Sequence, residues 1–106
     1  MASDQRKKCI AKLKIGDMVH LKMAENYGRM LSPSKNGIIS IPTQISYIET
    51  NEMLLLTTNV EGTIFWHLTA LDLSQHYPRS AGHKYGYWMD PSDLLVFCVK
   101  IVRAAQ

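Results

Sequence analysis

Turn signals recur along this chain at intervals of about 8–12 residues, with short apolar segments between them. Asn36-Gly37 is the strongest signal, because both residue types tolerate a positive φ and favour a two-residue hairpin turn. Between the turns, β-branched and aromatic residues favour strands. We therefore expect an all-β fold with strands at residues 9–15, 18–23, 29–31, 38–41, 45–48, 53–58, 63–69, 85–89 and 94–102. No segment predicts an amphipathic helix, and long loops are expected near residues 24–36 and 70–84.

Alternation within these segments predicts which side chains face the core. Val19, Leu21 and Met23 alternate with polar neighbours, so they should point inward from a half-buried strand. Residues 53–58 form a continuous apolar run, which suits a strand buried on both faces. Pro42 should end the strand at residues 38–41, since proline cannot donate a hydrogen bond to a ladder.

One motif occurs twice, at residues 27–34 and 85–92. Its pattern is Tyr-Gly, one free position, two bulky apolar residues, Ser or Asp, then Pro-Ser. Each copy leads into a short apolar segment, at residues 37–41 and 94–97. This internal repeat predicts that one hairpin design is used twice.

The composition is that of a single globular domain, with 106 residues, 46% apolar and 20% charged. The net charge of +3 is mild but unevenly distributed, because residues 36–78 contain no Lys or Arg. This pattern predicts a basic surface that binds either phosphates or an acidic partner protein. The alternative is that the uneven distribution arose by chance. We expect residues 1–8 to be a flexible basic tail and residues 9–106 to form one small β-barrel domain.

Several segments resemble units of a β-trefoil, as in fascin-like repeats and the MIR-type domains of intracellular calcium-release channels. The resemblance rests on Ile15-Gly16-Asp17-x-Val19-x-Leu21, Gly28-Arg29-Met30-Leu31-Ser32, Gly37-Ile38-Ile39, Phe65-Trp66-His67-Leu68 and the stretch 82–89. It covers about two units, residues 15–57 and 64–102, whereas a full trefoil has three. It implies a partial β-trefoil-like fold and, through it, a glycan-binding module, although no Gln-x-Trp triplet is present.

An SH3-like barrel is the rival architecture. Such barrels often open with a Gly-Asp-x-Val strand and a long first loop, and Gly16-Asp17-Met18-Val19 fits that start. They need only five or six strands, which this length supplies. We therefore expect a small β-barrel and leave the choice between the two topologies open.

The sequence predicts an intracellular, cytoplasmic location. The start is polar and basic without an apolar run behind it, so a signal peptide is not predicted. No stretch is long and apolar enough to predict a membrane span. Cys9 and Cys98 are expected to be reduced thiols, with a bridge between them as the alternative.

The pattern of reactive residues predicts neither catalysis nor a cofactor. The histidines at 20, 67, 76 and 83 fit no standard zinc spacing, so no metal site is expected. No Gly-x-Ser-x-Gly elbow or phosphate-binding Gly-x4-Gly-Lys motif is present. The acidic pairs Glu49/Glu52 and Asp90/Asp93 lie at predicted turns, where carboxylates accept backbone hydrogen bonds.

The strongest candidate site is a cluster of aromatic and basic residues between positions 76 and 88. Tyr, Trp and Arg are enriched at binding hot spots, because they combine a large rigid contact area with a polar tip. The predicted partner-binding residues are His76, Tyr77, Arg79, His83, Lys84, Tyr87 and Trp88. The alternative is that Tyr85 and Trp88 are core residues and the rest is a solvated loop. Strand alternation places Tyr85, Tyr87 and Met89 on one face, and Gly86 and Trp88 on the other.

Three binding functions are considered, and the first two depend on this cluster. The first is an adaptor module that recognises a protein partner through loops on the barrel. The second is a nucleic-acid-binding barrel whose phosphate-contacting residues include Lys7, Lys8, Lys12 and Lys14, with aromatic rings stacking on bases. The third is the glycan-binding module implied by the trefoil resemblance. Self-association into a homo-oligomer is expected if strand edges stay exposed.

Overall fold

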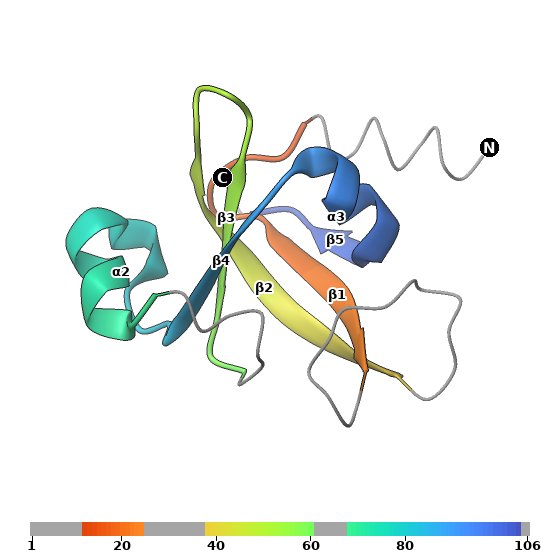
Figure 1. Cartoon of the computed structure of the whole chain (residues 1–106), viewed down its shortest axis with the longest axis horizontal. Coiled ribbons are helices and arrows are strands. Elements are labelled where there is room, and N and C mark those ends of the chain that lie inside the picture. The colour runs from red at the N-terminus through yellow and green to blue at the C-terminus, as the bar shows by residue number, and fades with distance from the viewer. Residues whose placement is uncertain (1–11, 25–37, 61–67, 105–106) are drawn as a thin grey trace.

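The computed structural model describes residues 12–24, 38–60 and 68–104 of the chain. These residues form a five-stranded antiparallel sheet with two short α-helices and a 3₁₀ turn (Figure 1). In chain order the elements are β1 (Met18–Ala24), β2 (Ile38–Ile48), β3 (Leu54–Thr58), α2 (Ala70–His76), η2 (Pro78–Ser80), β4 (Tyr85–Met89), α3 (Pro91–Phe97) and β5 (Cys98–Val102). The prediction of a mostly β fold is therefore confirmed, with two short helices in addition to the sheet.

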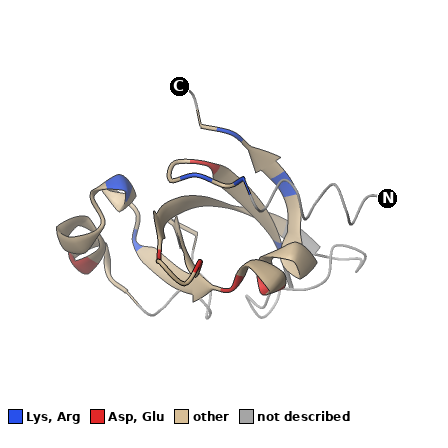
Figure 2. Ribbon diagram, turned by 90° about the horizontal axis from the view of Figure 1, so that it is seen from above, with Lys and Arg blue, Asp and Glu red and all other residues tan. Residues whose placement is uncertain are grey.

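The strand order is β4-β3-β2-β1-β5, with every neighbouring pair antiparallel. Figure 2 shows that the sheet is strongly curved. Within the described ranges, β4 pairs only with β3 and β5 only with β1, so the predicted closed barrel is corrected to an open, curved sheet. A helix of seven residues spans about 10 Å. That is about twice the distance between paired strands, and α3 connects the two edge strands β4 and β5.

β2 is one strand of 11 residues that serves both halves of the sheet. Its first part pairs with β1 and its last part with β3. Two separate strands, 38–41 ending at Pro42 and 45–48, were expected, and this prediction is wrong. Pro42 lies inside β2 opposite His20, and its carbonyl accepts a hydrogen bond from the Thr58 hydroxyl at 2.8 Å. A proline can occupy a strand position whose N–H the ladder does not need.

The main core lies against one face of the sheet, with α3 beside it. Val19 and Leu21 are fully buried there, as their alternation predicted. β3 is buried on both faces, which confirms the prediction for this apolar run. Cys98 is 2% exposed and belongs to the same core. The buried members of this core are Leu13, Val19, Leu21, Ile41, Ile45, Leu54, Leu56, Met89, Leu94 and Cys98.

α3 replaces part of a strand that was predicted over residues 94–102. The Asp90 carboxylate caps the helix by accepting hydrogen bonds from the Ser92 N–H at 2.8 Å and the Ser92 hydroxyl at 2.7 Å. These hydrogen bonds lower the pKa of Asp90. Pro91 occupies the first helical position, where its missing N–H costs nothing. The prediction of one long strand is wrong, because the capping signal outweighs the apolar run and only Cys98–Val102 remains a strand.

α2 lies in the stretch near 70–84 that was expected to be an irregular loop. Thr69 is its N-cap, accepting a hydrogen bond from the Asp72 N–H at 3.3 Å. Only Leu73 within the helix is buried. A seven-residue helix with one buried position has too few turns to show a periodic pattern, so the prediction of no helix was wrong here.

Other predicted segments lie partly or wholly outside the described residues. Residues 12–17 form turns rather than the end of the expected strand 9–15, and residues 68–69 precede α2 rather than extending the expected strand 63–69. The strand at 29–31, most of the loop at 24–36 and the first motif copy lie outside the described residues. The second motif copy is a strand followed by a helix, so the hairpin repeat is not found in that copy. No helix in the described ranges is long and apolar enough to cross a membrane.

Candidate binding site

Three aromatic rings from separate elements meet on the face of the sheet that α2 covers. Tyr47 lies on β2, Tyr77 follows α2 and Trp88 lies on β4. Their ring centroids are 5.2 Å (Tyr47–Tyr77), 5.9 Å (Tyr77–Trp88) and 6.1 Å (Tyr47–Trp88) apart, with interplanar angles of 55°, 77° and 89°. Aromatic pairs prefer such tilted and edge-to-face arrangements. We call these three residues the aromatic cluster.

A bulge in β2 brings Tyr47 into the aromatic cluster. In a regular strand Ile45 and Tyr47 would lie on the same face, because side chains alternate. Ile45 pairs with Leu56, whereas Tyr47 pairs with Leu55, so Ser46 is an extra residue on β2. Ile45 is therefore buried in the main core, while Tyr47 lies on the opposite face of the sheet beside Leu55.

α2 positions Tyr77 above β4. Leu73 is fully buried beneath the helix, and a Cβ placed on Gly86 would lie only 2.9 Å from Leu73 Cδ2. The absence of a side chain on Gly86 thus lets α2 approach the sheet closely. The Tyr77 N–H donates to the Leu73 carbonyl at 2.7 Å, which fixes the residue at the helix end. Two residues beyond Gly86, Trp88 shares its face of β4 and meets the Tyr77 ring.

The aromatic cluster is partly open to solvent. Tyr47 is 39% exposed, and Tyr77 and Trp88 are half-buried. His76 is exposed at the margin, with its ring centroid 6.2 Å from that of Tyr77. Leu71 on α2 is 75% exposed. This arrangement presents ring faces and edges, each with a polar group at its tip, which is suited to noncovalent recognition.

A chain of hydroxyl and imidazole groups lies beside the aromatic cluster. The Ser46 and Thr57 hydroxyl oxygens are 2.6 Å apart, and Thr57 Oγ1 lies 2.7 Å from His83 Nδ1. Ser46 is 2% exposed and Thr57 is fully buried. Burial lowers the pKa of His83 below its ordinary value of 6.5, and a hydrogen bond with the Thr57 backbone opposes this in part. His83 is therefore neutral at physiological pH.

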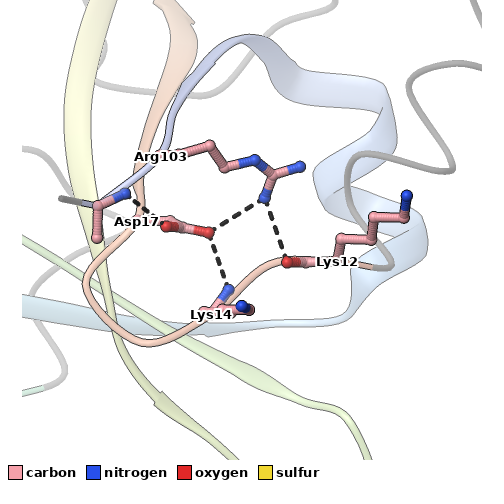
Figure 3. Close-up of polar contacts among 5 residues, drawn as sticks. Lys12, Lys14, Asp17 and Arg103 are labelled. Carbon is pink, nitrogen blue, oxygen red and sulfur yellow. Dashed lines mark hydrogen bonds and ion pairs between the residues drawn. The ribbon is translucent and has the colours of Figure 1, made fainter. Parts of the chain in front are cut away.

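Asp17 organises the turn before β1 (Figure 3). Its carboxylate accepts hydrogen bonds from the Lys14 N–H at 2.9 Å, the Ala104 N–H at 2.8 Å and Arg103 Nη1 at 3.1 Å. Arg103 Nη1 also donates to the Lys12 carbonyl at 3.3 Å. Burial raises the pKa of Asp17, but these hydrogen bonds and the Arg103 charge outweigh it and bring the pKa below 3.8. The predicted Gly16-Asp17 turn is confirmed, and it joins the start of the sheet to its end.

Basic side chains flank this turn. Lys12, Lys14 and Arg103 are exposed around it. A Cβ placed on Gly16 would lie 3.8 Å from Arg79 Nη1, so η2 contributes a further cation. In Figure 2 most Lys and Arg positions lie along the upper side of the ribbon and most Asp and Glu positions along the lower side. The described residues therefore show a more basic and a more acidic side.

The predicted partner-binding residues fall into two groups. His76, Tyr77 and Trp88 are brought together at the aromatic cluster. The others lie elsewhere: Arg79 beside the Gly16 turn, His83 against Thr57, Lys84 exposed with its N–H bound to Asn59 Oδ1 at 2.9 Å, and Tyr87 packed against the main core on the opposite face of the sheet. Lys12 and Lys14 are exposed at the turn, while Lys7 and Lys8 lie outside the described residues.

Tyr47 was not predicted as a site residue. It lies in a segment predicted to be a strand, where alternation with Ile45 would have placed its ring in the core. The signal for its true position is the bulge at Ser46, which only the pairing of β2 with β3 reveals.

The chain matches no protein family, no curated protein and no solved structure in the comparisons made. Within the described ranges, no three His, Cys, Asp or Glu side chains form a group that could hold a metal ion.

Proposed function

We propose that this chain is a non-enzymatic binding module that recognises a protein partner through the aromatic cluster. The main support is that the rings of Tyr47, Tyr77 and Trp88 meet from three parts of the fold while Tyr47 remains 39% exposed. Tyr and Trp dominate binding hot spots, because they offer a large contact area at a low cost in side-chain entropy. Arg79, His83 and Lys84 would contribute polar contacts at the rim.

An SH3-like architecture, rather than a β-trefoil-like one, fits the described strands better. One sheet of five strands, a Gly16-Asp17-Met18-Val19 start and a long connection between β1 and β2 are the features expected of that class. A trefoil would need three related units. The fold class alone does not assign a function, so the proposal rests on the aromatic cluster. We place the module inside the cell, on the basis of its low cysteine content.

The test compares a variant of the aromatic cluster with a variant of a distant surface. Wild type, Tyr47→Ala and Val96→Ala are used to capture partners from cell extract, and the captured protein is then purified and titrated. Val96 is 49% exposed on α3, so it controls for the loss of an exposed apolar side chain. We expect Tyr47→Ala to weaken binding about 30-fold, as for a hot-spot residue, and Val96→Ala to leave it unchanged. Equal binding by all three proteins would refute the proposed site.

A second candidate function is the binding of single-stranded nucleic acid. It is favoured by one observation, namely that Arg79 follows Tyr77 closely and lies beside the turn that carries Lys12 and Lys14. Aromatic rings next to a basic surface can stack on bases while cations contact phosphates. Titration with a labelled oligonucleotide at low and high salt separates the candidates. Steeply salt-dependent binding that Arg79→Gln weakens supports the nucleic acid, and salt-insensitive binding of a protein supports the first proposal.

A further inference from the structure

The hydroxyl–imidazole chain connects three parts of the fold at the edge of the aromatic cluster. Ser46 comes from β2, Thr57 from β3 and His83 from the turn before β4. The two contacts, 2.6 Å and 2.7 Å, are short hydrogen bonds. Because Thr57 is fully buried and Ser46 is 2% exposed, water cannot easily replace either partner. The position of each group therefore depends on the others.

Ser46 is also the extra residue of the β2 bulge. Without that insertion, Tyr47 would share the face of Ile45 and point into the main core. The hydrogen bond between the Ser46 and Thr57 hydroxyl groups holds the inserted residue against β3. The same bond thus holds the backbone geometry that directs the next residue, Tyr47, toward Trp88.

We propose that the Ser46–Thr57–His83 chain positions Tyr47 in the aromatic cluster, and that protonation of His83 loosens this arrangement and weakens partner binding below neutral pH. The first half concerns the fold alone. The second half rests on the proposed function, because it requires a partner that binds the aromatic cluster. Ser46, Thr57 and His83 act as positioning residues through Tyr47.

The physical basis is the cost of a charge at a half-buried site. A neutral imidazole can accept from or donate to Thr57, whereas an imidazolium can only donate and carries a charge that needs water. The ionisable neighbours do not provide compensation. β3 contains no ionisable side chain, and Tyr47 is the only ionisable residue in the part of β2 beside Ser46. η2 and the turn that follows it contribute the cations Arg79 and Lys84. Burial lowers the pKa of His83, a hydrogen bond with the Thr57 backbone opposes this in part, and no carboxylate contributes.

Nuclear magnetic resonance can follow both His83 and the aromatic cluster in the absence of a partner. The protein is titrated from about pH 8 to about pH 5, a range that covers histidine protonation, while the His83 ring carbons and the Trp88 indole N–H are observed. We expect His83 to titrate below 6.5 and the Trp88 signal to shift with the same midpoint. In His83→Gln the Trp88 transition should disappear, whereas in the control His76→Gln it should remain. His76 is the matched control, because it contacts Tyr77 directly.

Thr57→Val provides a second test that leaves His83 in place. Valine keeps the branched shape of threonine but removes the hydroxyl that joins Ser46 to His83, so the Trp88 signal should no longer follow His83. A Trp88 signal that stays constant while His83 titrates in the wild type would overturn the proposal. So would a transition that persists unchanged in His83→Gln or Thr57→Val.

Binding measurements separate this inference from the proposed function. If a partner binds the aromatic cluster, its apparent affinity should fall about tenfold at one pH unit below the His83 midpoint, in proportion to the remaining neutral fraction. His83→Gln should remove this dependence. If the Trp88 signal follows His83 but Tyr47→Ala does not affect any partner, the proposed function fails and the positioning role stands. If a partner depends on Tyr47 but neither binding nor Trp88 responds to His83, the inference fails and the proposed function stands.

Discussion

Gly86 sets how closely α2 can approach the sheet, so a methyl group at this position should disturb the whole site. A Cβ at Gly86 would lie 2.9 Å from Leu73 Cδ2, 3.3 Å from Leu68 Cδ1 and 3.4 Å from Leu55 Cδ1. The first distance is too short for any relaxed contact. Leu73 and Leu55 are both fully buried, so neither can turn away into solvent. We therefore expect Gly86→Ala to lower the free energy of unfolding by about 1–3 kcal/mol, the usual cost of overpacking.

The same geometry predicts that Leu73→Ala partly compensates Gly86→Ala. Alone, Leu73→Ala should cost about 2–5 kcal/mol, because it removes a fully buried side chain and leaves a cavity. In the double variant the methyl group added at position 86 would point into that cavity instead of meeting Leu73 Cδ2. The free energy of unfolding of the double variant should therefore exceed the value expected from the sum of the single effects by at least about 1 kcal/mol.

Urea unfolding followed by circular dichroism measures all four members of this double-mutant cycle. Trp88 fluorescence, recorded in a Trp66→Phe background to leave one tryptophan, reports whether the aromatic cluster has been displaced. The expected result is a shifted Trp88 emission in Gly86→Ala that returns toward that of the parent in the double variant. Effects that add within about 0.5 kcal/mol would show that Gly86 and Leu73 do not compete for space, and the reasoning would be wrong.

Two further predictions concern the supports of the sheet and of α2. Asp17→Asn should lower the free energy of unfolding by about 2–4 kcal/mol near neutral pH, because the amide cannot accept all the hydrogen bonds of this buried carboxylate. Since the folded pKa of Asp17 lies below 3.8, its contribution is complete above that pH and is lost on further acidification. The urea midpoints of wild type and variant should accordingly converge in acid, and a constant difference would argue against this role. Thr69→Ala removes the N-cap of α2 and should cost about 1 kcal/mol in the same assay, with Ser74→Ala on the exposed side of α2 as control.

The strands were the most predictable part of the fold. Val19 and Leu21 follow a strict alternation, and β3 begins with three consecutive leucines, so local sequence sufficed for both. α3 carried a readable signal in Asp90-Pro91, a cap followed by proline at the first helical position. The apolar residues after it suggested a strand instead. The capping signal favoured a helix and the apolar residues favoured a strand, and the strand predicted from the apolar residues was wrong.

The candidate site was predictable only in part. Tyr77 and Trp88 were identified from residue type and from their place in an aromatic-rich stretch. Tyr47 was not, because its direction depends on a one-residue shift in pairing between β2 and β3. Asp17 was identified as a turn residue, but its contact with the Ala104 N–H lies 87 positions away in sequence. Such features arise from tertiary pairing, which a single sequence does not display.

The pairing of β1 with β5 also bears on how the chain reaches its native state. β2 and β3 meet across a short turn at residues 49–53, whereas Asp17 and Ala104, which close the β1–β5 end of the sheet, are 87 positions apart. Closing the longer loop costs about 2.5 kcal/mol more in chain entropy. We therefore expect the β2–β3 hairpin to form early and the β1–β5 ladder to form after the folding barrier. Folding of such a sheet belongs to the slow, millisecond-to-second class, and unfolding should begin where β5 separates from β1.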